Sequence, residues 1–328
     1  MTYLLLLASL AIILLSAEVF TNGIEWLGKK LHLSEGAVGS LLAAVGTALP
    51  ETMIPVIAIL FGSGDMAEDV GIGAILGAPF MLSTLALGIT GFAAMIWKVK
   101  GKARQSMFID REVMNRDLKF FVLVYAVAVV AGIFSDGFKP LVALFLVAAY
   151  FYYVYKTLHC KGGQCEAHNP LYLARRHPDP GIPIVSLQVV IALIGIVIGA
   201  HLFVKEIEVL ASIWGVPAFI LSLIIAPIAT ELPEKFNSVI WVRQGKDTLA
   251  LGNITGAMVF QSSLIPALGI VLTPWKLSPL GILCAVLALV AAGTVLVLLN
   301  LRSEIRPITL AFNSIFYLIF VGTVVVMY

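Results

Sequence analysis

Ten long apolar stretches make up most of this chain, and each is long enough to cross a lipid bilayer as a helix. A bilayer's hydrocarbon core is roughly 30 Å thick, which about 20 helical residues can span. Because backbone polar groups must be paired inside lipid, such stretches fold as helices. The predicted spans are Tyr3–Asn22, Leu33–Phe61, Val70–Trp97, Leu118–Phe134, Pro140–Tyr155, Ile184–Val204, Val216–Val242, Thr248–Pro274, Leu280–Leu299 and Ile308–Met327. We interpret the first stretch as an uncleaved span, because no basic segment precedes it.

The composition excludes a soluble protein. Of the 328 residues 60% are hydrophobic and 12% are charged, far from the usual globular balance. The sequence therefore predicts an all-α integral membrane protein with multiple spans in the plasma or inner membrane. The net charge of +2 is too small to indicate a nucleic-acid partner. The bilayer is the expected partner, and we infer no obligate protein partner.

The distribution of basic residues predicts the orientation. Most Lys and Arg residues fall in the first, third, fifth, seventh and ninth connections, whereas the opposite connections contain only Lys139, Lys205 and Lys276. Because basic connections remain cytoplasmic, both termini are expected outside.

Two similar sequence motifs indicate that the chain consists of two related halves. "GTALPETMIP" contains Glu51 and "IATELPEKFN" contains Glu234, and aligning these glutamates places Thr47 over Thr230. After four extra residues in the first half, "GIGAILGA" lies over "LGNITGA". Each half has five predicted spans, and this odd number gives the second copy the opposite orientation. This is the inverted-repeat design of many secondary transporters. The expected organisation is residues 1–157, a cytoplasmic linker at 158–182, and residues 183–328.

The repeated motif has the chemistry of a cation site. Pro50 and Pro233 cannot donate a backbone hydrogen bond, so we expect each to break its helix and expose carbonyls, with further breaks at the other prolines within spans (Pro55, Pro79, Pro227 and Pro266). Thr47 precedes Glu51 by one turn, as Thr230 precedes Glu234, which places a hydroxyl and a carboxylate on one face. Such oxygens suit calcium or sodium. A carboxylate in the middle of a span is costly and indicates function.

The motifs "GTALPE", "TELPE" and "LGNITGA" resemble those of the cation/calcium antiporter superfamily, particularly prokaryotic sodium/calcium exchangers. The resemblance implies ten spans in two inverted repeats and transport without enzymatic activity or a resident cofactor. It further implies Ca²⁺ exchange for Na⁺ or H⁺, with Glu51 and Glu234 as the metal ligands and Thr47 and Thr230 beside them.

The chain departs from the family pattern at several ligand positions. The motif serine is Ala48 in the first half and Glu231 in the second. Where the family has small polar residues, the first half has apolar ones and the second half is mixed: Ala74, Ala78 and Leu82, against Asn253, Ala257 and Gln261. Sodium sites are thus depleted. Because Glu231 lies three residues before Glu234, one of these two carboxylates is expected to hold a proton when no cation is bound.

Three hypotheses follow. The first is an antiporter that exchanges calcium or a similar divalent cation for sodium by alternating access, with Glu231 as a ligand or proton carrier and Asn253 and Gln261 as auxiliary groups. The second is a proton-coupled exchanger of another cation that uses the Glu231 and Glu234 pair. The third is a transport-inactive membrane scaffold or an intramembrane enzyme. In the linker, "HCKGGQCEAH" contains His159, Cys160, Cys165 and His168, whose spacing allows metal binding without matching a strong zinc pattern.

Overall fold

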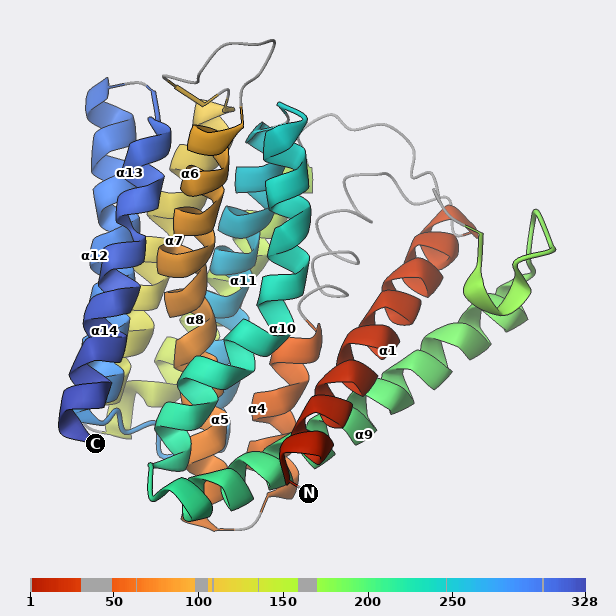
Figure 1. Ribbon diagram of the computed structural model, residues 1–328, viewed down its shortest axis with the longest axis horizontal. Coiled ribbons are helices and arrows are strands. Elements are labelled where there is room, and N and C mark those ends of the chain that lie inside the picture. Colours follow the sequence, from red (N-terminus) through yellow and green to blue (C-terminus); the bar gives the residue numbers. More distant parts are fainter. Residues whose placement is uncertain are drawn as a thin grey trace. The chain divides into compact units, whose positions relative to one another are not determined.

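The structure of the chain is a computed structural model whose described elements are all helical (Figure 1). It describes residues 2–30, 49–62, 64–97, 106–107, 109–134, 136–158, 170–245, 247–302 and 304–328. Within these ranges the side chains of residues 28, 49, 50, 136, 229, 232–237 and 249 are not described.

Each predicted span corresponds to a helix or to joined helical segments, except that residues 33–48 of the second predicted span lie outside the described residues. In the first half these are α1 (Thr2–Lys30), α4 (Leu49–Phe61), α5 (Asp65–Met81) with η2 (Leu82–Ala86) and α6 (Leu87–Ile96), α7 (Arg111–Ile133), and α8 (Lys139–Leu158). In the second half they are α9 (Ile182–Trp214), α10 (Ala218–Arg243), α11 (Asp247–Leu272), α12 (Pro279–Arg302), and α13 (Pro307–Phe312) with α14 (Ser314–Met327). Two short 3-10 helices, η3 (Asp136–Phe138) and η4 (Tyr172–Ala174), lie in connections.

Among the described residues, seven helical segments are long and apolar enough to cross a membrane. Two shorter apolar helices, Glu51–Phe61 and Ala218–Ile228, belong to α4 and α10. The helix α7 contains 23 residues and carries several charges in its first two turns. The chain is therefore an all-α membrane protein, as its sequence predicts.

Several prolines that were expected to break their helices lie inside continuous helices, whereas the chain directly before Pro50 lies outside the described residues. The helix α10 continues through Pro227 and Pro233, although Figure 1 shows that it changes direction along its length. Pro55 and Pro266 also lie inside α4 and α11. A proline removes one hydrogen bond and displaces one turn, so it can bend a packed helix without ending it.

The third span contains a π-helical segment, and it lies after Pro79 rather than at it. Pro79 lies inside α5, and η2 follows at Leu82–Ala86. The side-chain amide of Asn313 donates to the Ser83 carbonyl of η2 at 3.0 Å and to the Ala291 carbonyl at 3.2 Å. This buried amide thus joins the π-helical segment to α12.

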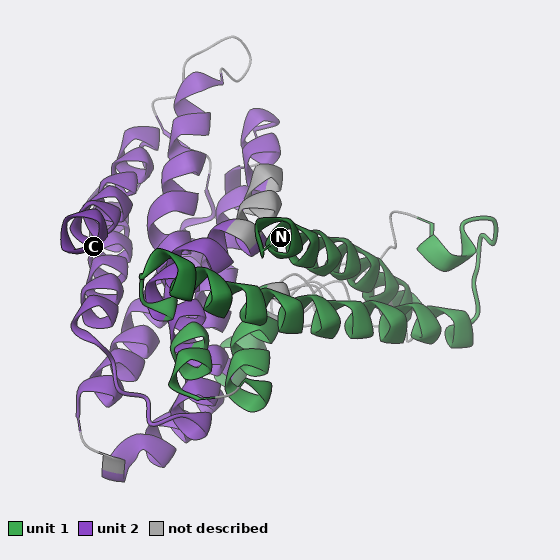
Figure 2. Ribbon diagram, turned by 60° about the horizontal axis from the view of Figure 1, so that its bottom comes forward, with its two compact units in different colours: residues 1–71, 151–218 green, residues 72–150, 219–328 purple. Residues whose placement is uncertain are grey.

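The helices form two compact units, shown in Figure 2, and the boundaries between the units fall inside α5, inside α8 and after the first residue of α10. Unit 1 comprises residues 1–71 and 151–218, and unit 2 comprises residues 72–150 and 219–328. Each unit therefore contains helices from both halves of the sequence.

In unit 1, α1 packs along α9, and a buried glutamine joins the two helices. The Gln188 side chain on α9 donates to the Val19 carbonyl at 2.9 Å and to Asn22 Oδ1 at 3.0 Å. Its own oxygen accepts from the Leu173 N–H at 2.9 Å. Asn22 also accepts from the Tyr172 N–H at 3.2 Å. One polar cluster therefore ties both helices to η4.

In unit 2, α7 and α11 run parallel along a seam with two polar contacts. The Asp110 N–H donates to Thr248 Oγ1 at 3.1 Å, and Thr255 Oγ1 donates to Asp117 Oδ2 at 2.9 Å. Both pairs are separated by 138 residues, and a constant separation is the mark of parallel helices in register. The contacts are seven residues apart, so they lie on the same face of each helix.

A second parallel seam joins the third span to α12. Cys284 Sγ lies 3.8 Å from the Leu76 carbonyl oxygen, and Asn313 bridges Ser83 and Ala291. Cys284 follows Leu76 by 208 residues, and Ala291 follows Ser83 by the same number, as in parallel helices. The repeat alignment that places Gly73 over Gly252 also places Leu76 over Thr255. Unit 2 thus contains equivalent seams from the two halves.

Candidate ion-binding site

Glu51 is the described carboxylate of the first repeat motif. It lies in the first turn of α4, within unit 1, and its side chain is 8% exposed. An ionised carboxylate at this burial requires hydrogen-bond donors or a cation. The second predicted span of the first half therefore contains a buried acid.

The helix α10, within unit 2, carries the second motif. Thr230 and Glu231 are both fully buried, and the Thr230 hydroxyl donates to the Ala226 carbonyl one turn earlier at 2.9 Å. A hydroxyl that donates keeps lone pairs with which it can bind a cation. The backbone of Glu234 is helical, one turn after Thr230, but its side chain lies outside the described atoms, as does that of Lys235.

The helices α10 and α11 are antiparallel, and a hydrogen bond fixes their register. The Ser238 hydroxyl donates to the Ala250 carbonyl at 3.4 Å, near the short turn that joins the helices. Glu231 precedes Ser238 by seven residues, and Ala257 follows Ala250 by seven. At the same rise per residue, these two positions lie at similar depth, with Asn253 closer to the turn. The motif carboxylates of α10 and the polar positions of α11 therefore occupy the same level of unit 2.

The middle of α11 has an open side and a buried side. Gly252, Asn253, Gly256 and Ala257 are half-buried, whereas Ile254, Thr255, Met258 and Val259 are buried. Among the described atoms, none lies within 4 Å of the position that a Cβ would take at Gly252. Further along the helix, Gln261 is 1% exposed. Asn253 therefore lies on the accessible side of α11.

The equivalent glycines of the first half have a different environment. A Cβ on Gly73 would lie 2.3 Å from the Phe219 carbonyl oxygen, and one on Gly77 would lie 2.2 Å from that of Leu223. These glycines therefore allow α5 to pack directly against the backbone of α10. Ala74, Ala78 and Leu82 are buried and apolar. In the first half, the segment from Gly73 to Gly77 thus packs against another helix. In the second half, the equivalent segment from Gly252 to Gly256 has an accessible side and carries the polar Asn253.

Several predicted residues lie outside the described atoms. Thr47 and the linker group His159, Cys160, Cys165 and His168 fall in ranges that are not described, and the side chain of Pro50 is not described either. Within the described part of the chain no three His, Cys, Asp or Glu side chains form a metal-binding group. The Glu234 carboxylate lies outside the described atoms, so the calcium site stays a prediction.

The motifs of both halves match one known family. The sequence model described as "Sodium/calcium exchanger protein" matches residues 1–158 and 184–328. The chain belongs to this family. The exchanger is 26% identical over 282 residues to the inner membrane protein YrbG of Escherichia coli K12, covering 84% of the chain and 82% of YrbG.

Solved structures of other exchangers share its fold. The H⁺/Ca²⁺ exchanger CAX superposes with a TM-score of 0.76 at 19% identity, covering 99% of this chain and 82% of CAX. The sodium-calcium exchanger NCX_Mj superposes with a TM-score of 0.62 at 19% identity, covering 98% of this chain and 99% of NCX_Mj. The exchanger is therefore a membrane antiporter with about ten transmembrane helices in two inverted five-helix repeats.

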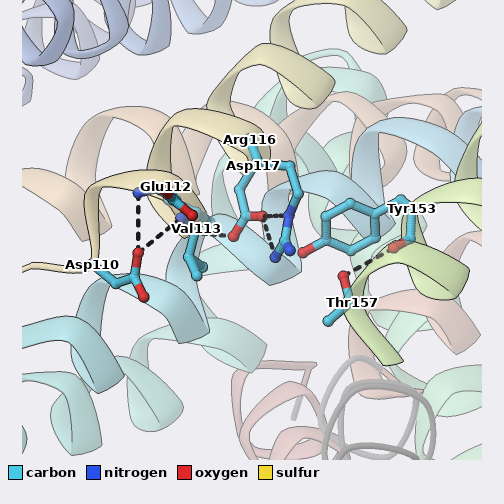
Figure 3. Close-up of polar contacts among 8 residues, drawn as sticks. Asp110, Glu112, Val113, Arg116, Asp117, Tyr153 and Thr157 are labelled. Carbon is cyan, nitrogen blue, oxygen red and sulfur yellow. Dashed lines mark hydrogen bonds and ion pairs between the residues drawn. The ribbon is translucent and has the colours of Figure 1, made fainter. Parts of the chain in front are cut away.

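Among the described residues, the sequence patterns missed three buried acids, Asp117, Glu206 and Asp247, and Asp117 is the one that joins two helices. Asp117 on α7 is 2% exposed and accepts the hydrogen bond from Thr255 described above. Its Oδ1 also accepts from Arg116 Nε and Nη2 at 3.2 and 3.1 Å (Figure 3). The predicted fourth span began at Leu118, so Asp117 was assigned to a connection. The adjacent Arg116 and Asp117, directly before an apolar run, were the available signal.

Proposed function

We propose that this exchanger moves calcium, or a similar divalent cation, in exchange for sodium by alternating access. The observation that carries the proposal is the burial of acidic residues inside apolar helices of both repeats, Glu51 at 8% exposure and Glu231 at 0%. A cation of charge +2 offsets the cost of such carboxylates and is bound through the hard oxygen ligands that they provide.

Each predicted residue has a role in this proposal. Glu51 and Glu234 are the central metal ligands, and Thr47 and Thr230 supply neighbouring oxygens. Asn253 and Gln261 on α11 are auxiliary polar groups. No resident cofactor is needed, because the ions are the cargo. The packed pair α1 and α9 is the part that we expect to slide during alternating access.

A proton-coupled mechanism is the second candidate, and the complete burial of Glu231 favours it. Glu231 and Glu234 are three residues apart on α10, so their carboxylates repel when both are ionised. The apolar residues Ala74, Ala78 and Leu82 weaken the case for sodium sites in the first half.

The proposed setting is a cell membrane, with inorganic cations as the ligands and both termini outside. The proposed organisation is one repeat in residues 1–157 and the other in residues 183–328, joined by a cytoplasmic linker.

The test is radiolabelled calcium uptake into proteoliposomes under an outward sodium gradient, repeated with an outward proton gradient in sodium-free buffer. Uptake driven by sodium supports the first mechanism, and uptake driven only by protons supports the second. Glu234→Gln is expected to abolish uptake while the protein remains folded. Glu112→Gln, which changes an exposed carboxylate at the start of α7, is the matched control. Normal uptake by Glu234→Gln would refute the site, and wild-type protein without cation binding or flux would favour an inactive scaffold.

A further inference from the structure

Asp117 forms a charged anchor inside unit 2. One carboxylate oxygen is engaged by the Arg116 guanidinium and the other by the Thr255 hydroxyl, which is 1% exposed. Hydrogen bonds to an ionised group are stronger than those between neutral groups. The bond to Thr255 therefore constrains α11 more firmly than apolar packing would.

Thr255 lies on the side of α11 opposite the polar positions. At about 100° per residue, Asn253, Ala257 and Gln261 fall within an arc of about 80°, and Thr255 lies about 160° from the centre of that arc. The burial pattern agrees at the first two positions of the arc, because Asn253 and Ala257 are half-buried whereas Thr255 is buried; Gln261, further along the helix, is buried as well. A bond at Thr255 therefore fixes the direction in which Asn253 faces.

A second contact prevents α11 from turning about this anchor. The Asp110 N–H donates to Thr248, seven residues earlier on the same seam. Asp110 is itself held, because its carboxylate caps α7 by accepting from the N–H groups of Glu112 and Val113 at 3.0 and 3.1 Å (Figure 3). Two contacts on one seam fix both the rotation and the axial position of α11 relative to α7.

Among the described residues, the equivalent seam between α5 and α12 has no charged contact of this kind. There Cys284 faces the Leu76 carbonyl at 3.8 Å, and Leu76 takes the place of Thr255. The helix that carries Leu76 has Ala74, Ala78 and Leu82 where α11 has Asn253, Ala257 and Gln261. The charged anchor thus acts on α11, which is the one of these two equivalent helices that keeps polar groups at Asn253 and Gln261.

We propose that Asp117 is a positioning residue for transport, which acts through Thr255 to hold Asn253 toward the ion path. This inference rests on the proposed function, because it assigns Asn253 to that path. It predicts that loss of the anchor weakens ion affinity more than it reduces turnover or the amount of folded protein.

The first test is the calcium concentration at half-maximal uptake. Thr255→Val keeps the side-chain shape and removes the hydroxyl, and it is expected to raise this concentration about three- to tenfold with little change in maximal rate. Thr255→Ser should restore the wild-type value. Because both changes break one bond, the double variant Asp117→Ala with Thr255→Val should be no worse than the more severe single variant. Cys284→Ala, in the equivalent seam, is the control and should leave the concentration unchanged. An unchanged value in Thr255→Val would overturn the proposal.

The second test reports on helix rotation without any transport. In a background without the three native cysteines, Ala257→Cys is expected to react with methanethiosulfonate ethylammonium much faster than Met258→Cys. Adding Thr255→Val should reduce the ratio of the two rates several-fold. An unchanged ratio would contradict the role of the anchor, whatever the flux. A changed ratio in a protein that carries no ion would instead retain the anchor and refute the proposed function.

Discussion

Replacing Gly73 by alanine tests the close packing of α5 against α10. The new Cβ would lie 2.3 Å from the Phe219 carbonyl oxygen, 3.1 Å from its carbonyl carbon and 3.2 Å from the Leu223 nitrogen. Ordinary contact begins at 3.4 Å, so the closest pair must separate by 3.4 − 2.3 = 1.1 Å. All three neighbours are backbone atoms of a helix, which cannot rotate away as a flexible side chain can.

The expected cost follows from two opposing terms. Overpacking of this kind costs about 1–3 kcal/mol, and the higher helix propensity of alanine returns up to about 1 kcal/mol. Gly73→Ala should therefore destabilise the protein by about 1–2 kcal/mol. Gly252→Ala is the matched control, because Gly252 is the repeat equivalent of Gly73 and its Cβ position is open. There only the propensity term acts, so this variant should be stabilised by up to about 1 kcal/mol.

The assay is thermal unfolding of the purified protein in one detergent. At roughly 2 °C per kcal/mol for a chain of this size, Gly73→Ala should lower the Tm by roughly 2–4 °C and Gly252→Ala should raise it by roughly 2 °C. Equal shifts in the same direction for both variants would refute the packing argument.

Two further variants test unit 1. Gln188→Leu removes the amide that donates to the Val19 carbonyl and to the Asn22 side chain. It should lower the free energy of unfolding by about 1–3 kcal/mol, measured as a lower Tm. An unchanged Tm would show that this cluster does not stabilise the packing of α1 against α9. The hydrogen bond and the charge of Lys30, 2.5 Å away, lower the pKa of the exposed Asp179 carboxyl. Its contribution to stability is therefore present above the ordinary pKa of about 3.9 and is lost as the pH falls through the lowered value. The Tm difference between wild type and Asp179→Asn should accordingly shrink between pH 6 and pH 3, and a difference that grows on acidification would contradict this assignment.

The spans could be predicted from the sequence because length and hydropathy decide them. The boundary at α7 was wrong by seven residues, since the prediction began at Leu118 and the helix begins at Arg111. A hydropathy argument ends a span where charges begin. Here the charges continue the helix, because Asp110 caps its start and Arg116 pairs with Asp117.

The repeat could also be read from the sequence, but its structural asymmetry could not. Gly73 and Gly252 are the same residue in aligned motifs, yet one packs against a backbone and the other faces open space. The contact between Asp117 and Thr255 joins residues 138 positions apart, and no local pattern indicates which helix faces which. The sequence also predicted a helix break at Pro233, whereas the backbone of α10 stays helical through it.

The seam between α7 and α11 also limits how the protein can move. A shift of α11 by one turn would carry Thr255 away from Asp117 and bring Leu251 or Val259 toward it, neither of which can donate a hydrogen bond. The Asp117 Oδ2 atom would then lose the hydrogen bond from Thr255 within a buried region, so such a ratchet is opposed in both directions. The two helices are therefore expected to move as one rigid body. The helices that change position relative to their neighbours during transport are expected to be ones that lack a charged contact of this kind.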